Sequence, residues 1–395
     1  MYILFSLLAL LPTVILSSPI WNPTPESHYD VVVVGGGPSG LSALSGLARV
    51  RRKALLIDSG QYRNLLTRHV HDVIGSDGVT PAYFRWNARQ QISQYPTVSM
   101  TNGTVTQIAK LNSSTFSIVD ADGNHYTSRK VVVATGLRDI LPSTPGIAEN
   151  WARGIYWCPW CDGYEHRDQP LGLLGAIDKI FGLVLEVDTL DTDLIAFTNG
   201  TMTAEGLQVL NTAQPDWENI VKIYNVKIDN RTISTIERIQ DGGIVNNIAT
   251  KTEYDKFLVH FDDGTTAERG AFFTGWPSVQ ASNVGTDLGI GMKGNKLYNN
   301  ITTMATNIQG AYAVGDANMD GSTNVPHAMW SGKRAAVDIH LAMAEEDFES
   351  AVIAAGLSKR DDDPESDREL LLRYIGEEFE NLWKLEATSE YLNFT

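Results

Sequence analysis

A regular hydrophobic pattern begins at residue 29, in the stretch YDVVVVGGGPSGLSALSGLARVRRKALLIDSG. Its four consecutive valines, 31–34, form an apolar run of the kind that a strand buried on both faces requires. Apolar residues then recur at helical spacing at positions 41, 44, 47 and 48, and a second apolar run, 53–57, ends at Asp58. The order strand, helix, strand predicts a βαβ unit of a parallel sheet.

Later apolar runs extend this sheet and indicate a second one. Val131–Gly136 and Ala311–Asn318 are predicted to be buried strands, and a helical pattern follows from His327 to Met343. Between them, strand-like runs occur in LGLLGA, DLIAFTNG, KFLVHF and AFFTGW. The sequence therefore predicts an α/β protein with two Rossmann-like domains. Residues 28–150 and 276–343 form a discontinuous domain, and residues 151–275 form a second domain inserted into it.

The two ends of the chain differ from this pattern. Residues 2–16 form an apolar run, shorter than the roughly 20 residues of a membrane span and followed by small residues. We expect residues 1–18 to be a signal peptide, with an uncleaved anchor as the alternative, and no stable membrane span. Residues 344–395 are predicted to contain an acidic linker and a C-terminal amphipathic helix. In the linker, Lys359-Arg360 is a processing site or simply solvated, and the helix has Leu371, Ile375, Phe379 and Leu382 on one face.

Composition and charge narrow the function classes. The 395 residues are 43% hydrophobic and 20% charged, as in a globular protein of two domains. A net charge of −16 argues against nucleic acid and anionic membranes as partners, because both bind basic faces. Together with the signal-like start, six glycosylation triplets indicate a secreted glycoprotein or one that resides in the secretory pathway. They begin at Asn102, Asn112, Asn199, Asn230, Asn300 and Asn393.

Three glycines after the first strand, Gly35, Gly37 and Gly40, have G-x-G-x-x-G spacing. The first suits a tight turn, the second lets the backbone approach a pyrophosphate, and the third lets helix and strand pack closely. The helix N-terminus offers N–H groups to the phosphates, and Asp58 can accept hydrogen bonds from a ribose diol. Because strand, helix, second strand and acid occur in this order, the sequence predicts a dinucleotide site.

Both cysteines of the chain, Cys158 and Cys161, lie in WCPWCDGYEH. The C-x-x-C spacing favours an easily reduced disulfide with one stabilised thiolate. A zinc site would need more ligands than the nearby His166 provides, and a static staple across four residues would restrain little of the unfolded chain. Asp162 is either a proton carrier for the thiols or a turn residue. We therefore expect a redox centre and no metal.

The motifs GGGPSG, ATG, CPWCDG and VGDAN occur in the order found in low-molecular-weight thioredoxin reductases, which residues 28–343 resemble. The resemblance implies FAD in the discontinuous domain, NADPH in the inserted one, and a homodimer. It also implies that Cys161 faces the flavin and that Cys158 attacks the substrate sulfur. The FAD contacts it implies are Gly35, Gly37, Pro38, Ser39 and Gly40 at the pyrophosphate, Asp58, Ser59, Gly60, Gln61, Tyr62 and Arg63 around the ribose and adenine, Asp316 at the ribityl chain, Thr323 and Asn324 beside the isoalloxazine, and His71, Val105, Thr135 and Gly136 elsewhere.

The inserted domain departs from this family pattern at its own nucleotide turn. In LGLLGAIDKIFG, Gly172 falls within the predicted strand, so that Gly175 is the only glycine at the turn. No arginine cluster follows the next strand to bind a 2′-phosphate. NADPH is therefore a doubtful cofactor.

A flavin and a redox dithiol without a hydride source imply that electrons enter from a substrate. A small dithiol would reduce the cysteine pair, the pair would reduce FAD, and O2 would reoxidise it to give hydrogen peroxide. This resembles the fungal dithiol oxidases related to gliotoxin oxidase, which close disulfides in secondary metabolites. His327 is either a base for the substrate thiol or a helix-terminal histidine. The alternatives are an NADPH-dependent reductase of a thioredoxin-like disulfide and a non-catalytic flavin-binding protein that acts through a partner.

Overall fold

The run of four valines forms the centre of a parallel sheet in the structure, a computed structural model that describes residues 28–357. β1 (His28–Val34) pairs in parallel with β2 (Ala54–Asp58) on one side and β6 (His125–Val133) on the other. Between β1 and β2, α1 (Pro38–Arg49) buries its leucine face. The predicted βαβ unit is confirmed.

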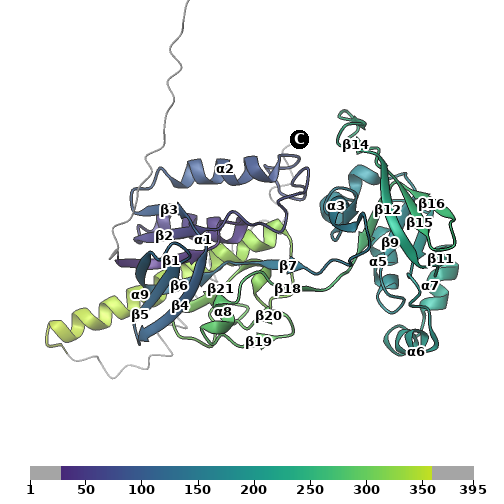
Figure 1. Cartoon of the computed structure of the whole chain (residues 1–395). Helices are drawn as coiled ribbons and strands as arrows, with labels where there is room; N and C mark the ends of the chain where they lie inside the picture. Colours follow the sequence, from purple (N-terminus) through teal and green to yellow (C-terminus); the bar gives the residue numbers. More distant parts are fainter. Residues whose placement is uncertain (1–27, 358–395) are drawn as a thin grey trace, which may run out of the picture. The chain divides into compact units, whose positions relative to one another are not determined.

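Seven strands make up this first sheet (Figure 1). Its path is β3 (Val98–Asn102), β2, β1, β6, β5 (Thr115–Asp120) and β4 (Val105–Asn112), and β21 (Ala311–Ala313) pairs with β6. The β21–β6 pairing is parallel and matches Ala311 to Val131. A strand from the end of the chain thus completes the sheet begun by β1, which confirms a discontinuous Rossmann-like domain.

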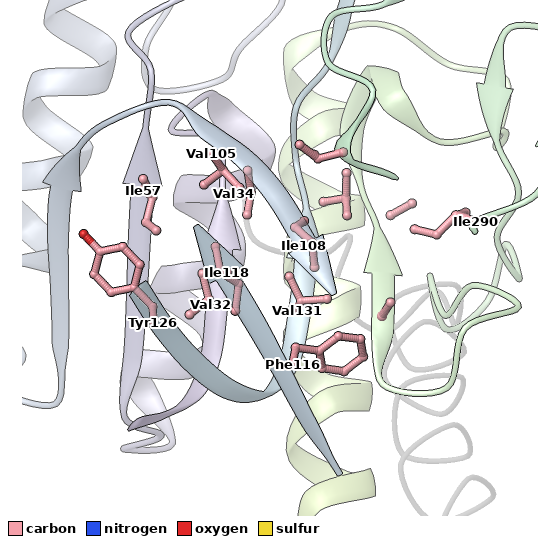
Figure 2. Close-up of a cluster of buried hydrophobic side chains, with 14 of the residues drawn as sticks. Val32, Val34, Ile57, Val105, Ile108, Phe116, Ile118, Tyr126, Val131 and Ile290 are labelled. Atoms are coloured by element: carbon pink, nitrogen blue, oxygen red, sulfur yellow. The ribbon is translucent and has the colours of Figure 1, made fainter. Parts of the chain in front are cut away.

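The core of this sheet lies under an antiparallel hairpin, β4–β5 (Figure 2). Ile108, Phe116 and Ile118 of the hairpin belong to one buried cluster with Val32 and Val131 of the parallel strands. Burial of each such side chain contributes about 1.5–3 kcal/mol, so the hairpin is part of the core.

The inserted region forms a second parallel sheet. Its order is β11 (Lys227–Asp229), β10 (Leu194–Phe197), β9 (Leu171–Leu174), β17 (Ala271–Thr274) and β8 (Ile155–Tyr156). A three-stranded antiparallel sheet accompanies it: β12 (Ile233–Gln240), β15 (Lys256–Phe261) and β16 (Thr266–Arg269). The four apolar runs predicted here are β9, β10, β15 and β17. Ile147 also belongs to a core of this region, although it precedes residue 151, where we expected the inserted domain to begin.

Short pairs of strands connect and extend the two sheets. β7 (Leu137–Asp139) pairs with β18 (Ser278–Gln280) where the chain leaves the first sheet and where it returns to it. The remaining pairs are β13 (Asn246–Asn247) with β14 (Thr252–Glu253) and β19 (Met292–Lys293) with β20 (Lys296–Leu297).

The helices differ widely in length, and those not yet described are α2 (Pro81–Ile92), α3 (Ile147–Asn150), α4 (Pro159–Asp162), α5 (Ile180–Val187), α6 (Ala204–Ala213), α7 (Trp217–Ile223), α8 (Val284–Asp287) and α9 (Val325–Ala354), with 3-10 turns η1 (Tyr164–His166) and η2 (Gly315–Ala317). The backbone up to His340 forms one compact unit, and residues 341–357 are the described part of a second. α9 continues past Met343, where the predicted helix ends, because the charged residues at positions 345–347 and 349 are compatible with an exposed helix.

Several predictions concern residues that the structure does not describe. The signal peptide at 1–18, Lys359-Arg360, Asn393 and the amphipathic C-terminal helix lie outside residues 28–357. Within those residues, no helix combines the length and the apolar character needed to cross a membrane.

Two glycines of the inserted domain differ in the space around them, and their substitution tests how tightly this domain is packed. A Cβ on Gly172 of β9 would lie 2.4 Å from Cδ1 of the buried Phe272 ring, whereas no atom lies within 4 Å of a Cβ on Gly175. We expect Gly172→Ala to lower the free energy of unfolding by about 1–3 kcal/mol, as overpacking does, and Gly175→Ala to change it by less than about 0.5 kcal/mol. Urea unfolding of the two variants measures the difference, and equal values would contradict the packing described here.

Candidate active site

One cavity of about 600 Å³ collects most of the residues that the sequence predicts for the site. The predicted residues that line it are Gly35, Gly37, Pro38, Ser39, Asp58, Ser59, Gln61, Tyr62, Arg63, His71, Val105, Thr135, Gly136, Cys161, Asp162, Asp316, Thr323 and Asn324. Gly40, Gly60, Cys158 and His327 are not among its lining residues. The cavity has the size of a small-molecule or cofactor site.

In the glycine loop between β1 and α1, Gly40 and Gly37 have different surroundings, as their spacing predicts. A Cβ on Gly40 would lie 1.9 Å from the Gly35 carbonyl oxygen, so this glycine permits close packing of helix and strand. A Cβ on Gly37 would meet nothing within 4 Å, and Gly37 lines the cavity. Within residues 28–357, no side chain caps α1. The loop and the helix N-terminus therefore fit the pyrophosphate of a dinucleotide.

Asp58 is nearly buried, with 2% of its side chain exposed, and its oxygens already accept several hydrogen bonds. The donors are the backbone N–H groups of Gly36 and Gly60, both at 3.1 Å, and the Tyr62 hydroxyl at 2.5 Å. Arg89 pairs with the same carboxylate. Asp58 thus fixes the glycine loop and the loop that follows β2, and its contact with a ribose stays a prediction.

The two cysteines form a disulfide at the start of α4. The Cys161 backbone N–H donates to the Cys158 carbonyl at 3.1 Å, which closes the turn between them. Cys161 lines the cavity, and Cys158 does not. Two tryptophans, Trp151 and Trp157, stack at 5.1 Å and line the same cavity beside the pair.

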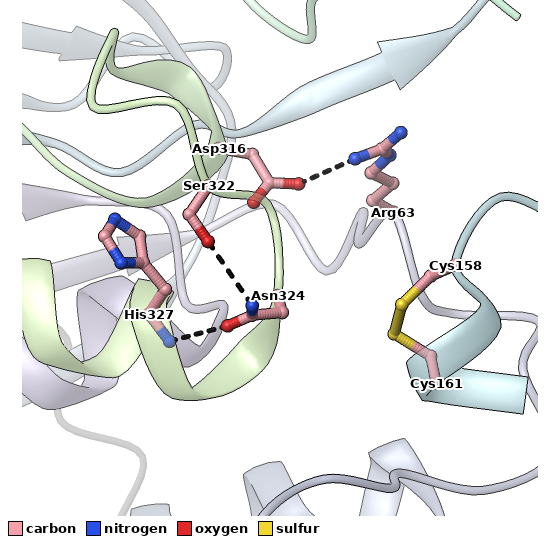
Figure 3. The surroundings of a disulfide bond; sticks show 7 residues. All are labelled: Arg63, Cys158, Cys161, Asp316, Ser322, Asn324 and His327. Atoms are coloured by element: carbon pink, nitrogen blue, oxygen red, sulfur yellow. Dashed lines mark hydrogen bonds and ion pairs between the residues drawn. A yellow bond between two sulfur atoms is a disulfide. The ribbon is translucent and has the colours of Figure 1, made fainter. Parts of the chain in front are cut away.

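The Arg63 side chain contacts Asp316, a residue for which the resemblance implied a different place along FAD. Its guanidinium lies 3.1 Å from Asp316 (Figure 3) and 2.6 Å from Asp139, and it stacks over the Trp157 ring at 5.0 Å. The resemblance implied that Arg63 lies at the ribose and adenine and Asp316 at the ribityl chain. The two side chains contact each other, and their contacts with FAD stay predictions. Neither the Asp139 contact nor the Trp157 contact has a sequence signal.

His327 is not among the residues that line the cavity. Its Nε2 is 2.7 Å from Asp320 Oδ2, and its ring packs against Trp330. Its backbone N–H donates to Asn324 Oδ1 at the start of α9, and Figure 3 shows the ring directed away from the disulfide. The structure thus favours the helix-terminal histidine.

Asp162, directly after Cys161, is buried among ionisable groups. Burial raises the pKa of its carboxyl well above the ordinary value, and the charges of Glu165 and Glu253 add to the rise, while Arg68 opposes it. A carboxyl group in this environment retains its proton beside the disulfide.

A cluster around Arg68 surrounds Asp162, and the sequence gave no indication of it. Arg68 pairs with Glu253, with Asp255 at 2.8 Å and with Asp241 at 2.7 Å. His166, Glu253 and Asp255 also place three potential ligand atoms within 4.8 Å of one another, but both carboxylates already pair with Arg68, and Asp255 also pairs with Arg238. No motif indicates this cluster, because its members are far apart in the sequence.

The nucleotide turn of the inserted domain contains an apolar side chain. Gly172 lies within β9, as predicted, and α5 starts only at Ile180. Between them Ile177 is fully buried, and its N–H donates to Thr201 Oγ1 at 3.0 Å. The nearby Arg231 pairs with Asp229 and stacks on Phe261.

The chain is similar to known proteins in sequence and in fold. The family model described as pyridine nucleotide-disulphide oxidoreductase matches residues 29–180. A probable thioredoxin reductase of Arthroderma benhamiae is 48% identical over 91% of each chain. The thioredoxin reductase aclD of Aspergillus oryzae is 30% identical over 74% of this chain and 89% of its own length. The crystal structure of HlmI is similar with a TM-score of 0.72 at 28% identity, covering 83% of this chain and 96% of that one.

The pKa of Asp162 predicts a pH-dependent stability. Because the native pKa exceeds that of the unfolded chain, the native state binds more protons than the unfolded state between the two values, so wild-type stability falls as pH rises through that range. We expect Asp162→Asn to melt at a higher temperature than the wild type at pH 7, with the gap closing towards pH 4. The exposed Asp122→Asn serves as the control, and a gap independent of pH would contradict the assignment.

Proposed function

Because the chain belongs to the thioredoxin-reductase-like family of pyridine nucleotide-disulphide oxidoreductases and is therefore an oxidoreductase acting on sulfur, we propose that it is an FAD-dependent dithiol oxidase with O2 as electron acceptor. Its substrate would be a small molecule with two thiols that it converts into a disulfide.

One observation carries the proposal: the redox disulfide and the glycine loop meet at the same cavity. Gly37 and the N-terminus of α1 would hold the pyrophosphate of FAD, and Asp316, Thr323 and Asn324 would lie along the rest of the cofactor. Bound FAD supplies a two-electron acceptor for the cysteine pair, and its reoxidation by O2 yields hydrogen peroxide.

The cysteines perform the exchange with the substrate. A substrate thiolate attacks the Cys158 sulfur, the Cys158–Cys161 bond breaks, and its electron pair remains on Cys161. The second substrate thiol then closes the substrate disulfide and releases Cys158. The pair has gained two electrons, and the substrate has lost two electrons and two protons. Over the cycle, one dithiol and one O2 give one disulfide and one hydrogen peroxide.

The direction of electron flow rests on the inserted domain. The turn after β9 has Ile177, whose side chain is anchored in the core, where further small residues would let the backbone approach a second pyrophosphate, and Arg231 is engaged by Asp229. These features support a protein that does not take hydride from NADPH. The relatives named thioredoxin reductase favour the alternative, an NADPH-dependent disulfide reductase.

A dithiol assay separates the two functions. We expect the FAD-loaded protein to oxidise dithiothreitol in air with one hydrogen peroxide per disulfide, without NADPH. Cys158→Ser and Cys161→Ser should each lower this rate by about 100-fold or more, because each sulfur is needed for the exchange. Peroxide release that persists in both variants would remove the pair from the reaction, and turnover that requires NADPH would support the reductase.

We also propose that the protein enters the secretory pathway as a glycoprotein and, as the family resemblance implies, acts as a homodimer. An oxidising compartment suits an enzyme that forms disulfides. The five acceptor asparagines among the described residues, Asn102, Asn112, Asn199, Asn230 and Asn300, are all exposed.

Glycosylation gives a direct test of this route. We expect the protein secreted by a eukaryotic host to lose mass on treatment with an N-glycosidase, and Asn→Gln changes at the five exposed acceptors to remove most of that loss. A secreted protein whose mass the enzyme leaves unchanged would contradict the glycoprotein assignment, and retention in the cytosol would contradict the route.

A further inference from the structure

A second, much smaller cavity lies beside Asp162. Its volume of about 10 Å³ is close to the space that one water molecule needs. All eight residues that line it carry ionisable side chains: Arg68, His69, His71, Tyr156, Asp162, Glu165, His166 and Glu253. Asp162, His69 and His71 also line the larger cavity. The small cavity is therefore a polar space between the redox site and the groups behind it.

A line of contacts leads from this space to solvent. Glu165 Oε1 lies 3.4 Å from Nε2 of His71, and Nδ1 of the same ring lies 3.1 Å from Asp77 Oδ1. The Asp77 side chain is 46% exposed, whereas that of Glu165 is 9% exposed. The two nitrogens of one imidazole thus face a buried carboxyl on one side and an exposed carboxyl on the other, an arrangement in which histidine can pass protons.

The pKa shifts of the buried carboxyl groups favour a proton path through Glu165 over one through Glu253. Burial opposes ionisation of Glu253, but its contacts with His69 and Arg68 lower its pKa, so it remains a carboxylate. Burial raises the pKa of Glu165, which brings this carboxyl closer to the pH at which it can both take up and release a proton. Tyr156, Arg68 and His166 also face Asp162, and burial raises the pKa of Tyr156, so this hydroxyl keeps its proton.

We propose that Glu165 and His71 carry protons between Asp162 and solvent at Asp77, by way of a water molecule in the small cavity. This role rests on the proposed function and takes Asp162 as the proton carrier for the cysteine pair, one of the two roles that its position after Cys161 allows. In one direction, the Asp162 O–H bond breaks as the water takes the proton and gives one of its own to Glu165. Glu165 then passes a proton to Nε2 of His71, and the proton on Nδ1 leaves through Asp77. Each donor recovers its proton in the reverse sequence, and no electrons move.

The rate at which Asp162 responds to a change of pH tests the path without turnover. The carbonyl stretch of its protonated carboxyl is assigned by infrared difference spectroscopy of the full chain, as the band that Asp162→Asn removes. After a rapid pH jump, we expect the band of the wild type to follow quickly and that of His71→Gln and Asp77→Asn to follow about tenfold or more slowly. Glu237→Gln and His260→Gln, from a carboxylate–histidine pair 2.8 Å apart elsewhere, serve as matched controls.

Two outcomes decide the proposal. Unchanged relaxation in both His71→Gln and the exposed Asp77→Asn would overturn it, and so would equal slowing in the controls. Because Asp77 lies near the surface, its variant keeps the test valid if His71→Gln fails to fold. The measurement uses no dithiol, so a wild type that fails to oxidise dithiols would refute the proposed function and leave the pH-jump result standing. In the active enzyme, Asp77→Asn should lower kcat more at high pH than at low pH, while the FAD content stays equal.

Discussion

The ion pairs of Arg68 with Glu253 and Asp255 join parts of the chain that are 185 and 187 residues apart in the sequence. Arg68 comes from the loop after β2, and the two acids come from the inserted region. Removing one partner of a buried pair typically costs about 3–5 kcal/mol, because the other charge is left uncompensated. Arg68 and Glu253 also line the small cavity beside Asp162. These ion pairs therefore belong to the charged surroundings of the residue that follows Cys161.

The parts of the site that the sequence predicts are those set by local geometry. Spacing and hydrophobic period predict the glycine loop, β1, α1 and β2, and the C-x-x-C spacing indicates the redox pair. Most of the residues implied by the family resemblance lie around one cavity, although their individual roles stay predictions. For His327 the sequence left two roles open, because spacing fixes its helix but not the direction of its ring, and the structure places the ring against Asp320.

The residues that the sequence could not identify act through long-range contacts. Glu165 and His71 are separated in the sequence, and only the fold brings their side chains to 3.4 Å. Arg63 likewise meets Asp316 across 253 positions. No period or motif encodes such pairs. The apolar turn at Ile177 is the opposite case, because the missing glycines of LGLLGAIDK already indicated it, and the structure adds that the Ile177 side chain is buried in the core of the inserted region.

The central claim is that electrons enter through the disulfide and not through the inserted domain. The most direct measurement mixes the FAD-loaded protein, without oxygen, with a dithiol and separately with NADPH, and follows flavin absorbance by stopped flow. The account predicts rapid bleaching by the dithiol that disappears in Cys161→Ser, and bleaching by NADPH that is far slower. Rapid bleaching by NADPH in the wild type would contradict it.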